Sequence, residues 1–185
     1  MSASQAKPGG GQARQDASSL RLNPESNAGF LLVSIANRLS ASASRAYMRH
    51  YGVGVMEWRI VGMLAARPGI TANQIGLVSG VDKSSVSRAT KSLLKRGYVR
   101  TEEDPSDSRR LLLFLTPAGQ ALHDRIIVAS LAREELLLDG LSARDRETFF
   151  RLLKQVGANM ALVNAHDPTA DSTPRRRRAP GKRRE

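Results

Sequence analysis

The stretch Ile70–Val99 restricts the possible folds of this 185-residue chain more than any other part. Thr71 and Gln74 have the spacing of a capping box, which predicts the start of a short helix. Gly80 then permits a tight turn, and Asp82 is a suitable N-cap for a second helix. We therefore predict two short helices joined by a tight turn, which is a helix-turn-helix.

The two helices have distinct faces. In the shorter helix, 72–79, Ile75 and Val78 are expected to be the apolar positions. In the second helix, apolar residues recur at helical spacing on one side: Val86, Ala89, Leu93 and Leu94. The opposite side is polar and basic, and the first turns of a recognition helix meet base edges and phosphates. The residues that we expect to contact DNA from this helix are Lys83, Ser84, Ser85, Ser87, Arg88 and Lys91. The opening of the shorter helix can take a phosphate on its exposed N–H groups, through Thr71, Asn73 and Gln74.

The net charge of +12 and the pI near 11 favour a polyanionic partner. The excess is unevenly placed. Residues 166–185 hold seven Arg or Lys against three acidic residues, and residues 71–116 hold eight against five. About a third of the excess therefore lies in the tail, and the pI alone overstates the case for a DNA-binding fold.

The chain has no cysteine, which excludes a disulfide framework, a zinc finger and a thiol-based sensor. No apolar run approaches the ~18 residues of a membrane span, and the N-terminus lacks the apolar centre of a signal peptide. We expect a cytoplasmic protein without a membrane partner.

The acidic residues and histidines show no hydrolase, phosphate-loop or metal spacing, so we expect no enzyme, no catalytic residues, no cofactor and no metal site. His50, His123 and His166 are far apart in the sequence, although His123 and Asp124 could contribute part of a metal site.

The chain is predicted to have three parts. Residues 1–24 are too polar to pack and residues 165–185 form a basic, proline-containing tail, so both are expected to be disordered. Residues 25–164 form one domain of the mainly α class. Its other elements are expected to be a long helix over 26–50, a helix over 55–66, short strands at 98–101 and 111–115 joined by the loop EEDPSDSRR, a helix over 117–139 and a last helix over 143–163.

The last helix has a continuous apolar stripe that needs a surface to pack on: Phe149, Leu152, Leu153, Val156 and Met160. The long helix before it and the first helix have apolar sides too. The simplest solution is a homodimer in which the terminal helices of two subunits interleave.

A further pattern lies between the two short strands. Asp107-Ser108-Arg109 is followed, after five residues, by Leu115-Thr116. This D-x-R-x5-L-T pattern resembles the wing of the MarR family of bacterial transcription regulators, and the resemblance extends over residues 28–160. It implies a winged helix-turn-helix at about 55–116, with a two-stranded β wing and with dimerisation helices at about 26–50 and 117–163.

The resemblance assigns roles to the wing. Arg109 can enter the narrow minor groove of double-stranded DNA, where the negative potential favours an arginine. Asp107 can hold that guanidinium bidentately and aim it, and Arg110 contacts either a phosphate or nothing. The alternative for Asp107 and Arg109 is an ordinary turn ion pair of little energetic value.

The resemblance also implies a function. Dimeric regulators of this family, most often repressors, bind a pseudo-palindromic operator and are released by a small molecule bound between the dimerisation helices and the winged helix. The candidate ligand-binding residues are Tyr47, His50, Tyr51, Trp58, Arg59 and Met63. Aromatic walls beside His and Arg would suit a small aromatic carboxylate, and the first two helices look most like family members that repress catabolism of aromatic acids such as nicotinic acid. The alternative function is an architectural or counter-silencing DNA-binding protein without a small-molecule inducer.

Overall fold

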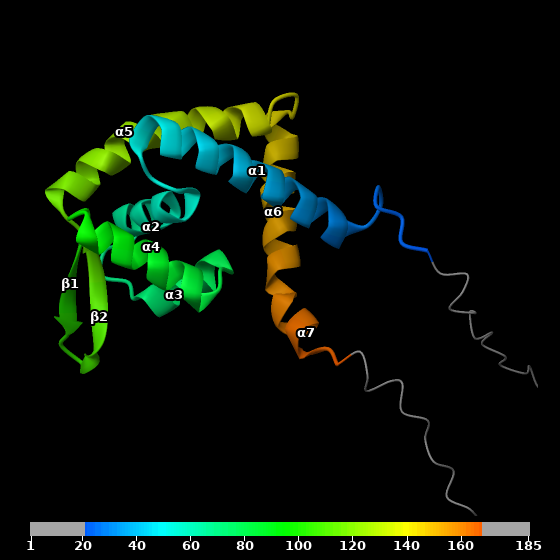
Figure 1. Ribbon diagram of the computed structural model, residues 1–185. Helices are drawn as coiled ribbons and strands as arrows, with labels where there is room; N and C mark the ends of the chain where they lie inside the picture. Colours follow the sequence, from blue (N-terminus) through cyan, green and yellow to red (C-terminus); the bar gives the residue numbers. More distant parts are fainter. Residues whose placement is uncertain (1–20, 168–185) are drawn as a thin grey trace, which may run out of the picture. The chain divides into compact units, whose positions relative to one another are not determined.

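The computed structural model describes residues 21–167 (Figure 1). Our predictions for residues 1–20 and 168–185 lie outside this part of the chain. The described elements are α1 (Ala28–Tyr51), α2 (Val55–Ala66), α3 (Ala72–Ser79), α4 (Lys83–Lys95), β1 (Val99–Asp104), β2 (Asp107–Leu115), α5 (Pro117–Leu137), α6 (Ala143–Ala158) and α7 (Met160–Ala165). The chain divides after Ala129 into two compact units, which are described separately.

The core of the first unit lies among α2, α3 and α4, which Figure 1 shows grouped together with the two-stranded sheet at the end of α4. Its fully buried side chains include Ile60, Leu64, Ile75, Val86 and Leu93. The predicted apolar side of α4 is confirmed, since Val86, Ala89 and Leu93 are buried and Leu94 packs against them.

The prediction for the shorter helix was half wrong. Ile75 is fully buried, but Val78 is 66% exposed and its neighbour Leu77 also faces solvent. Residues three apart lie on the same side of a helix, but the eight-residue α3 buries only Ile75, so Val78 lies on an uncovered edge of that side.

The predicted caps are confirmed. The Thr71 hydroxyl accepts a hydrogen bond from the Gln74 backbone N–H (3.2 Å), and the side-chain Oε1 of Gln74 accepts one from the Thr71 backbone N–H (2.8 Å). Gly80 has a positive φ of 64°, and Asp82 caps α4 by accepting from the Ser85 N–H (2.9 Å). These local interactions define the tight turn and the direction in which α4 leaves it.

The strands of the wing are longer than predicted, because all of the expected loop except residues 105–106 lies within them. Residues 99–103 pair antiparallel with residues 111–115, and the pairing then jumps to Asp104 opposite Asp107. The sequence did not predict these longer strands because their added residues are polar. Both faces of the hairpin tip are exposed, so apolar and polar residues do not alternate there. Residues 108–110 bulge out of the ladder, which re-aims their side chains.

The wing is attached to the segment before α3. The N–H of Gly69 donates to the Leu113 carbonyl (2.9 Å), and the N–H of Leu113 donates to the Ile70 carbonyl (3.1 Å). Leu113 itself is buried. The wing therefore has a defined position relative to the opening of α3.

The second unit contains the end of α5 with α6 and α7 (Figure 1). Gly140, between α5 and α6, has a positive φ (80°), and Ser142 caps α6 by accepting from the Asp145 N–H (3.2 Å). The single last helix that we predicted is wrong, because α6 ends at Ala158 and α7 begins after Asn159. The Asn159 N–H bonds to the Val156 carbonyl (3.1 Å), three residues back, and this tighter turn interrupts the α-helical pattern.

Both units expose apolar helix faces. On α1 these side chains are Phe30, Leu31, Leu32, Val33, Ile35 and Leu39. On α6 and α7 they are Phe149, Phe150, Leu152, Val156, Met160, Leu162 and Val163. Contiguous exposed apolar surface of this kind is typical of protein–protein contact sites.

Candidate nucleic-acid interface

The outer face of α4 presents the side chains that were predicted to read DNA. Lys83, Ser84, Arg88 and Lys91 are exposed, whereas Ser85 and Ser87 are partly buried. The buried side of α4 packs on the core of the first unit, so that this face is directed to solvent. The helix thus offers three cations and several hydroxyls on one surface.

Asp82 organises the first turn of α4. Its Oδ1 accepts from the Ser84 hydroxyl and from the Ser85 N–H. The Ser84 and Ser85 side-chain and backbone hydrogen bonds hold the pKa of Asp82 well below its usual range, since each favours the ionised carboxylate. The Arg88 guanidinium donates to the hydroxyls of Ser84 (3.2 Å) and Ser85 (3.0 Å). The Arg88 side chain therefore extends along its own helix, and it must break its bonds to Ser84 and Ser85 before it can bond to a base.

The wing arginines share one carboxylate. Arg109 Nε donates to Asp107 Oδ1 (3.0 Å), and Arg110 Nε lies 3.2 Å from Asp107 Oδ2. The predicted bidentate pair between Asp107 and Arg109 is therefore wrong, because the second carboxylate oxygen is taken by Arg110. The Arg109 side chain remains 90% exposed, so its terminal NH groups are available to a ligand.

A groove of about 670 Å³ separates the opening of α3 from the wing arginines. Its lining combines Asn73 of α3 with Arg109 and Arg110 of β2. The side chains of Thr71 and Gln74 also line it, but they are bonded to each other in the capping box. Within this groove, Asn73 and the two arginines are thus the side chains best placed to contact a phosphate backbone.

The predicted ligand-binding residues are brought together only in part. The Tyr47 ring lies 6.0 Å from Trp58 and 6.3 Å from Tyr51, and His50 lies 6.4 Å from Tyr51 at the exposed edge. Arg59 instead donates to Ser40 on α1 (3.0 Å).

Met63 packs against the core of the first unit. The aromatic cluster is therefore defined by Tyr47, Tyr51 and Trp58, with His50 at its edge.

The aromatic cluster also includes two residues of α5, His123 and Arg125, which were not among the ligand-binding residues predicted from the sequence. The His123 ring stacks on Trp58 with centroids 5.6 Å apart, and the Arg125 guanidinium lies 5.8 Å from the Tyr51 ring. His123 Nδ1 lies 3.0 Å from Asp124 Oδ1, and this hydrogen bond lowers the pKa of Asp124. No sequence signal could have found them, because 65 residues separate Trp58 from His123 and only the packing of α5 on α2 joins them.

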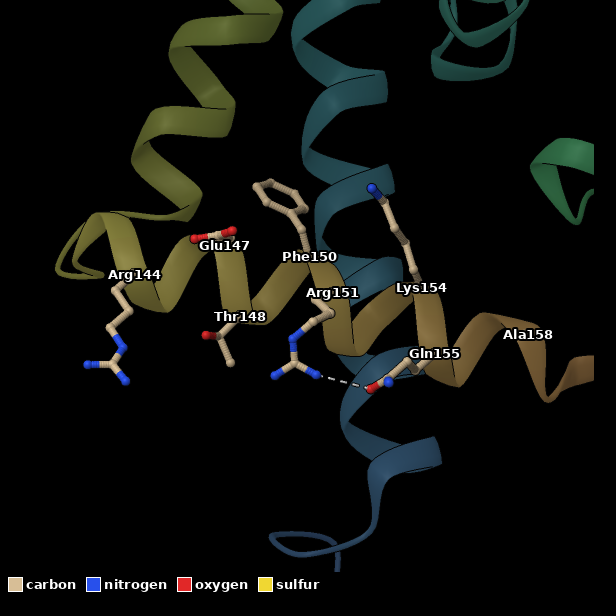
Figure 2. A pocket seen from close by; sticks show the side chains of 8 residues that line it. All are labelled: Arg144, Glu147, Thr148, Phe150, Arg151, Lys154, Gln155 and Ala158. Atoms are coloured by element: carbon tan, nitrogen blue, oxygen red, sulfur yellow. Dashed lines mark hydrogen bonds between the residues drawn. The ribbon is translucent and has the colours of Figure 1, made fainter.

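A cavity of about 840 Å³ lies along α6 and is lined by that helix alone (Figure 2). Its charged lining residues are Arg144, Glu147, Arg151 and Lys154, and Arg151 donates to Gln155 (3.4 Å). Phe150 also lines it. This surface belongs to the second unit.

The described residues contain no cluster of three His, Asp or Glu side chains with the arrangement of a metal site. None of the helices in residues 21–167 has the length and apolar content needed to cross a bilayer.

Residues 51–110 match the model of the MarR family. Among characterised relatives, a putative transcriptional regulatory protein for the hcr operon of Thauera aromatica is 29% identical over 94 residues, which are 51% of this chain and 57% of that protein. The chain thus spans little more than half the length of this relative. The HTH-type transcriptional repressor NicR of Pseudomonas putida is 26% identical over 122 residues, which are 60% of this chain and 77% of the repressor.

Solved structures agree with this assignment over a longer part of the chain. A MarR/EmrR family transcriptional regulator from Acinetobacter sp. ADP1 superimposes with a TM-score of 0.72 at 28% identity, covering 76% of this chain and 99% of that one. The PcaV transcriptional regulator from Streptomyces coelicolor, solved in complex with its natural ligand, gives 0.61 at 26% identity, covering 75% and 97%.

These relatives are transcriptional regulators and not enzymes. The helix-turn-helix, the wing with its Asp107–Arg109 pair and the match to the family model lead to the same assignment. This chain therefore carries a MarR family domain over residues 51–110 and has the winged helix-turn-helix fold of MarR family transcriptional regulators.

Proposed function

We propose that this protein is a dimeric, sequence-specific DNA-binding transcriptional regulator. The observation that carries the proposal is the exposed face of α4, with Lys83, Arg88 and Lys91 directed to solvent, in the same unit as the wing arginines on Asp107. An α-helix with this face fits the major groove, and an exposed arginine on a β-ribbon fits the narrow minor groove. Ser84, Ser85 and Ser87 would supply hydroxyl contacts to bases or phosphates, and Asn73 a phosphate contact.

The exposed apolar faces of α1 and of α6 with α7 support a homodimer, because a second copy would remove these side chains from water. Two recognition helices related by a two-fold axis would read half-sites about one turn of DNA apart, which predicts a pseudo-palindromic operator.

We further propose that a small molecule controls DNA binding at the aromatic cluster of Tyr47, Tyr51 and Trp58. The His123 and Arg125 side chains beside these rings supply hydrogen-bonding and positive groups, which suits an aromatic carboxylate. Such a ligand would act by binding one spacing of the two recognition helices more tightly than another. The relatives named as a repressor and as a regulator with a natural ligand support repression relieved by a ligand, in preference to an architectural DNA-binding protein.

The proposal is tested first by selecting random double-stranded DNA on the full chain and measuring binding of the most enriched duplex by fluorescence anisotropy at fixed salt. We expect an inverted repeat and a clear preference over a scrambled duplex. Equal affinity for both duplexes would contradict sequence-specific regulation and favour the architectural alternative.

The dimer is tested by sedimentation of the full chain and of a variant that lacks residues 142–163. We expect a dimer for the full chain and a monomer for the variant. A monomeric full chain would contradict the proposed architecture.

The ligand is tested with benzoate, salicylate and nicotinate. Trp58 is the only tryptophan, so its fluorescence reports binding at the aromatic cluster directly. We expect at least one of these acids to change the Trp58 emission and to release the enriched duplex. A change in neither signal would reject an aromatic carboxylate as the effector.

A further inference from the structure

Glu57 is a buried carboxylate that none of the roles above requires. It lies in the first turn of α2, and the residue is 8% exposed. Its Oε2 accepts from the Gly54 N–H (2.7 Å), which caps α2. Its Oε1 accepts from the hydroxyl of Ser92 on α4 (2.6 Å). One carboxylate therefore joins the start of α2 to the last part of the recognition helix.

Arg96 extends this connection to α1. Its guanidinium lies 3.6 Å from Glu57 Oε1 and donates to the carbonyl of Gly52 (2.9 Å), the left-handed residue that ends α1. The same guanidinium covers the Tyr98 ring at 4.9 Å. Arg96 is the C-cap of α4, so both of its polar contacts tie the end of the recognition helix to the α1–α2 turn.

The α1–α2 turn is also next to the aromatic cluster. Tyr47 and Tyr51 lie in the last two turns of α1, and Trp58 follows Glu57 directly in α2. A displacement of α1 against α2 at these rings must therefore change the position of Gly52 or of Glu57, and each of them is bonded to α4. Hydrogen bonds to a buried charged group are among the stronger ones, which makes the connection stiff.

We propose that Glu57 is a positioning residue for DNA recognition: through Ser92 and Arg96 it sets the angle at which α4 is presented, and it transmits changes at the aromatic cluster to α4. This inference rests on the proposed function, because sequence discrimination must exist before Glu57 can contribute to it. Glu57 is buried and contributes without touching DNA. It gives Ser92, four residues beyond Arg88 on the same helix, an orienting role and not a DNA contact.

The primary variant is Ser92→Ala, which removes the bond between α2 and α4 but leaves the cap of α2 intact. The hydroxyl is restored in Ser92→Thr. The matched control is Ser79→Ala, because the Ser79 hydroxyl is partly buried in the same helix-turn-helix but bonds within its own helix, to the Ile75 carbonyl (2.7 Å). A Glu57→Ala variant and the Glu57→Ala, Ser92→Ala double variant complete a double-mutant cycle.

The measured quantity is the ratio of affinities of the full chain for the enriched duplex and for its scrambled form at one salt concentration. We expect Ser92→Ala and Glu57→Ala each to lower this ratio about tenfold, the scale of one hydrogen bond to a charged group. Affinity for the scrambled duplex should stay unchanged, because phosphate contacts do not depend on the exact angle of α4. The double variant should lose no more than either single variant, and Ser92→Thr should recover most of the ratio.

The inference would be overturned by an unchanged ratio in Ser92→Ala, by an equal loss in Ser79→Ala, or by additive losses in the double variant. A fall in affinity for both duplexes together with a large fall in melting temperature would show a structural role only, and would also overturn it. A wild-type ratio near one would reject the proposed function and the inference with it, whereas a wild-type preference that Ser92→Ala leaves intact rejects the inference alone.

Discussion

Gly119 lies in the first turn of α5, where that helix meets the start of the wing. A Cβ atom at this position would lie 2.0 Å from the carbonyl oxygen of Tyr98 and 3.2 Å from a methyl group of Leu115. The Tyr98 oxygen is not free to move away, since it accepts the Thr116 N–H (3.0 Å), and the Thr116 hydroxyl in turn bonds to the Gly97 carbonyl (2.6 Å). A Gly119→Ala substitution must therefore shift backbone on both sides of the contact.

The magnitude follows from two opposing effects. Alanine is favoured over glycine inside a helix by roughly 0.5–1 kcal/mol. Overpacking costs about 1–3 kcal/mol, and a contact of 2.0 Å against backbone belongs at the upper end of that range. We expect a net loss of about 2 kcal/mol, which for a unit of this size lowers the melting temperature by roughly 6–12 °C.

Gly62 provides the matched control, because it lies inside α2 and an added Cβ would meet nothing within 4 Å. Gly62→Ala should leave stability unchanged or raise it by up to about 1 kcal/mol. Both variants are measured by circular dichroism at 222 nm during heating, and by binding to the enriched duplex, because a displaced wing also misplaces Arg109. If Gly119→Ala melts at or above the wild-type temperature, the close approach of α5 to Tyr98 is not a constraint and the reasoning fails.

Four further changes test the wing and the caps of α3 and α4. Arg109→Ala should weaken binding of the enriched duplex by roughly 1–3 kcal/mol in anisotropy titrations at fixed salt, and an unchanged affinity would remove the wing from the interface. Asp107→Asn should alter the free energy of unfolding by less than about 1 kcal/mol, since its ion pairs are exposed. It should still weaken DNA binding, because Arg109 and Arg110 lose the carboxylate that orients them. Tighter binding would refute that role. Thr71→Ala should cost about 1 kcal/mol of stability in urea titrations, whereas Thr71→Ser should cost little. The lowered pKa of Asp82 means that its carboxylate stabilises the fold above its unfolded pKa of about 3.9, and that this contribution is lost as the pH falls through the folded value. Asp82→Asn, which keeps an N-cap that does not titrate, should therefore lose less stability than the wild type on acidification below about pH 4, and equal losses would contradict the assignment.

The helix-turn-helix was predictable because its signals are local. Thr71 with Gln74, Gly80 and Asp82 each act within about one turn of the chain, so the predicted bounds of α3 and the predicted start of α4 agree with the structure. The exposed basic face of α4 was also predictable. The helical period of 3.6 residues places Val86 and Leu93 on one side of the helix and Arg88 on another, whatever elements pack against it.

Local patterns failed where no apolar face was being buried. The tip of the wing is exposed on both sides, so its strands carry no alternation, and the register was visible only from the pairing with residues 99–104. The break at Asn159 was missed because the apolar stripe continues across it from Val156 to Met160, so the pattern of apolar residues does not mark the end of α6.

The sequence by itself determined the local elements of this protein: where its helices begin, which side of α4 is polar and which residues carry the charge of the wing. Only the tertiary structure decided the partners of the long side chains. Asp107 holds two arginines instead of one, His123 stacks on Trp58, and Glu57 bonds to Ser92 across 35 residues of chain. Caps and periodicity act between neighbours in the chain, whereas these contacts depend on how separate helices pack, which the spacing of residues in a sequence does not encode.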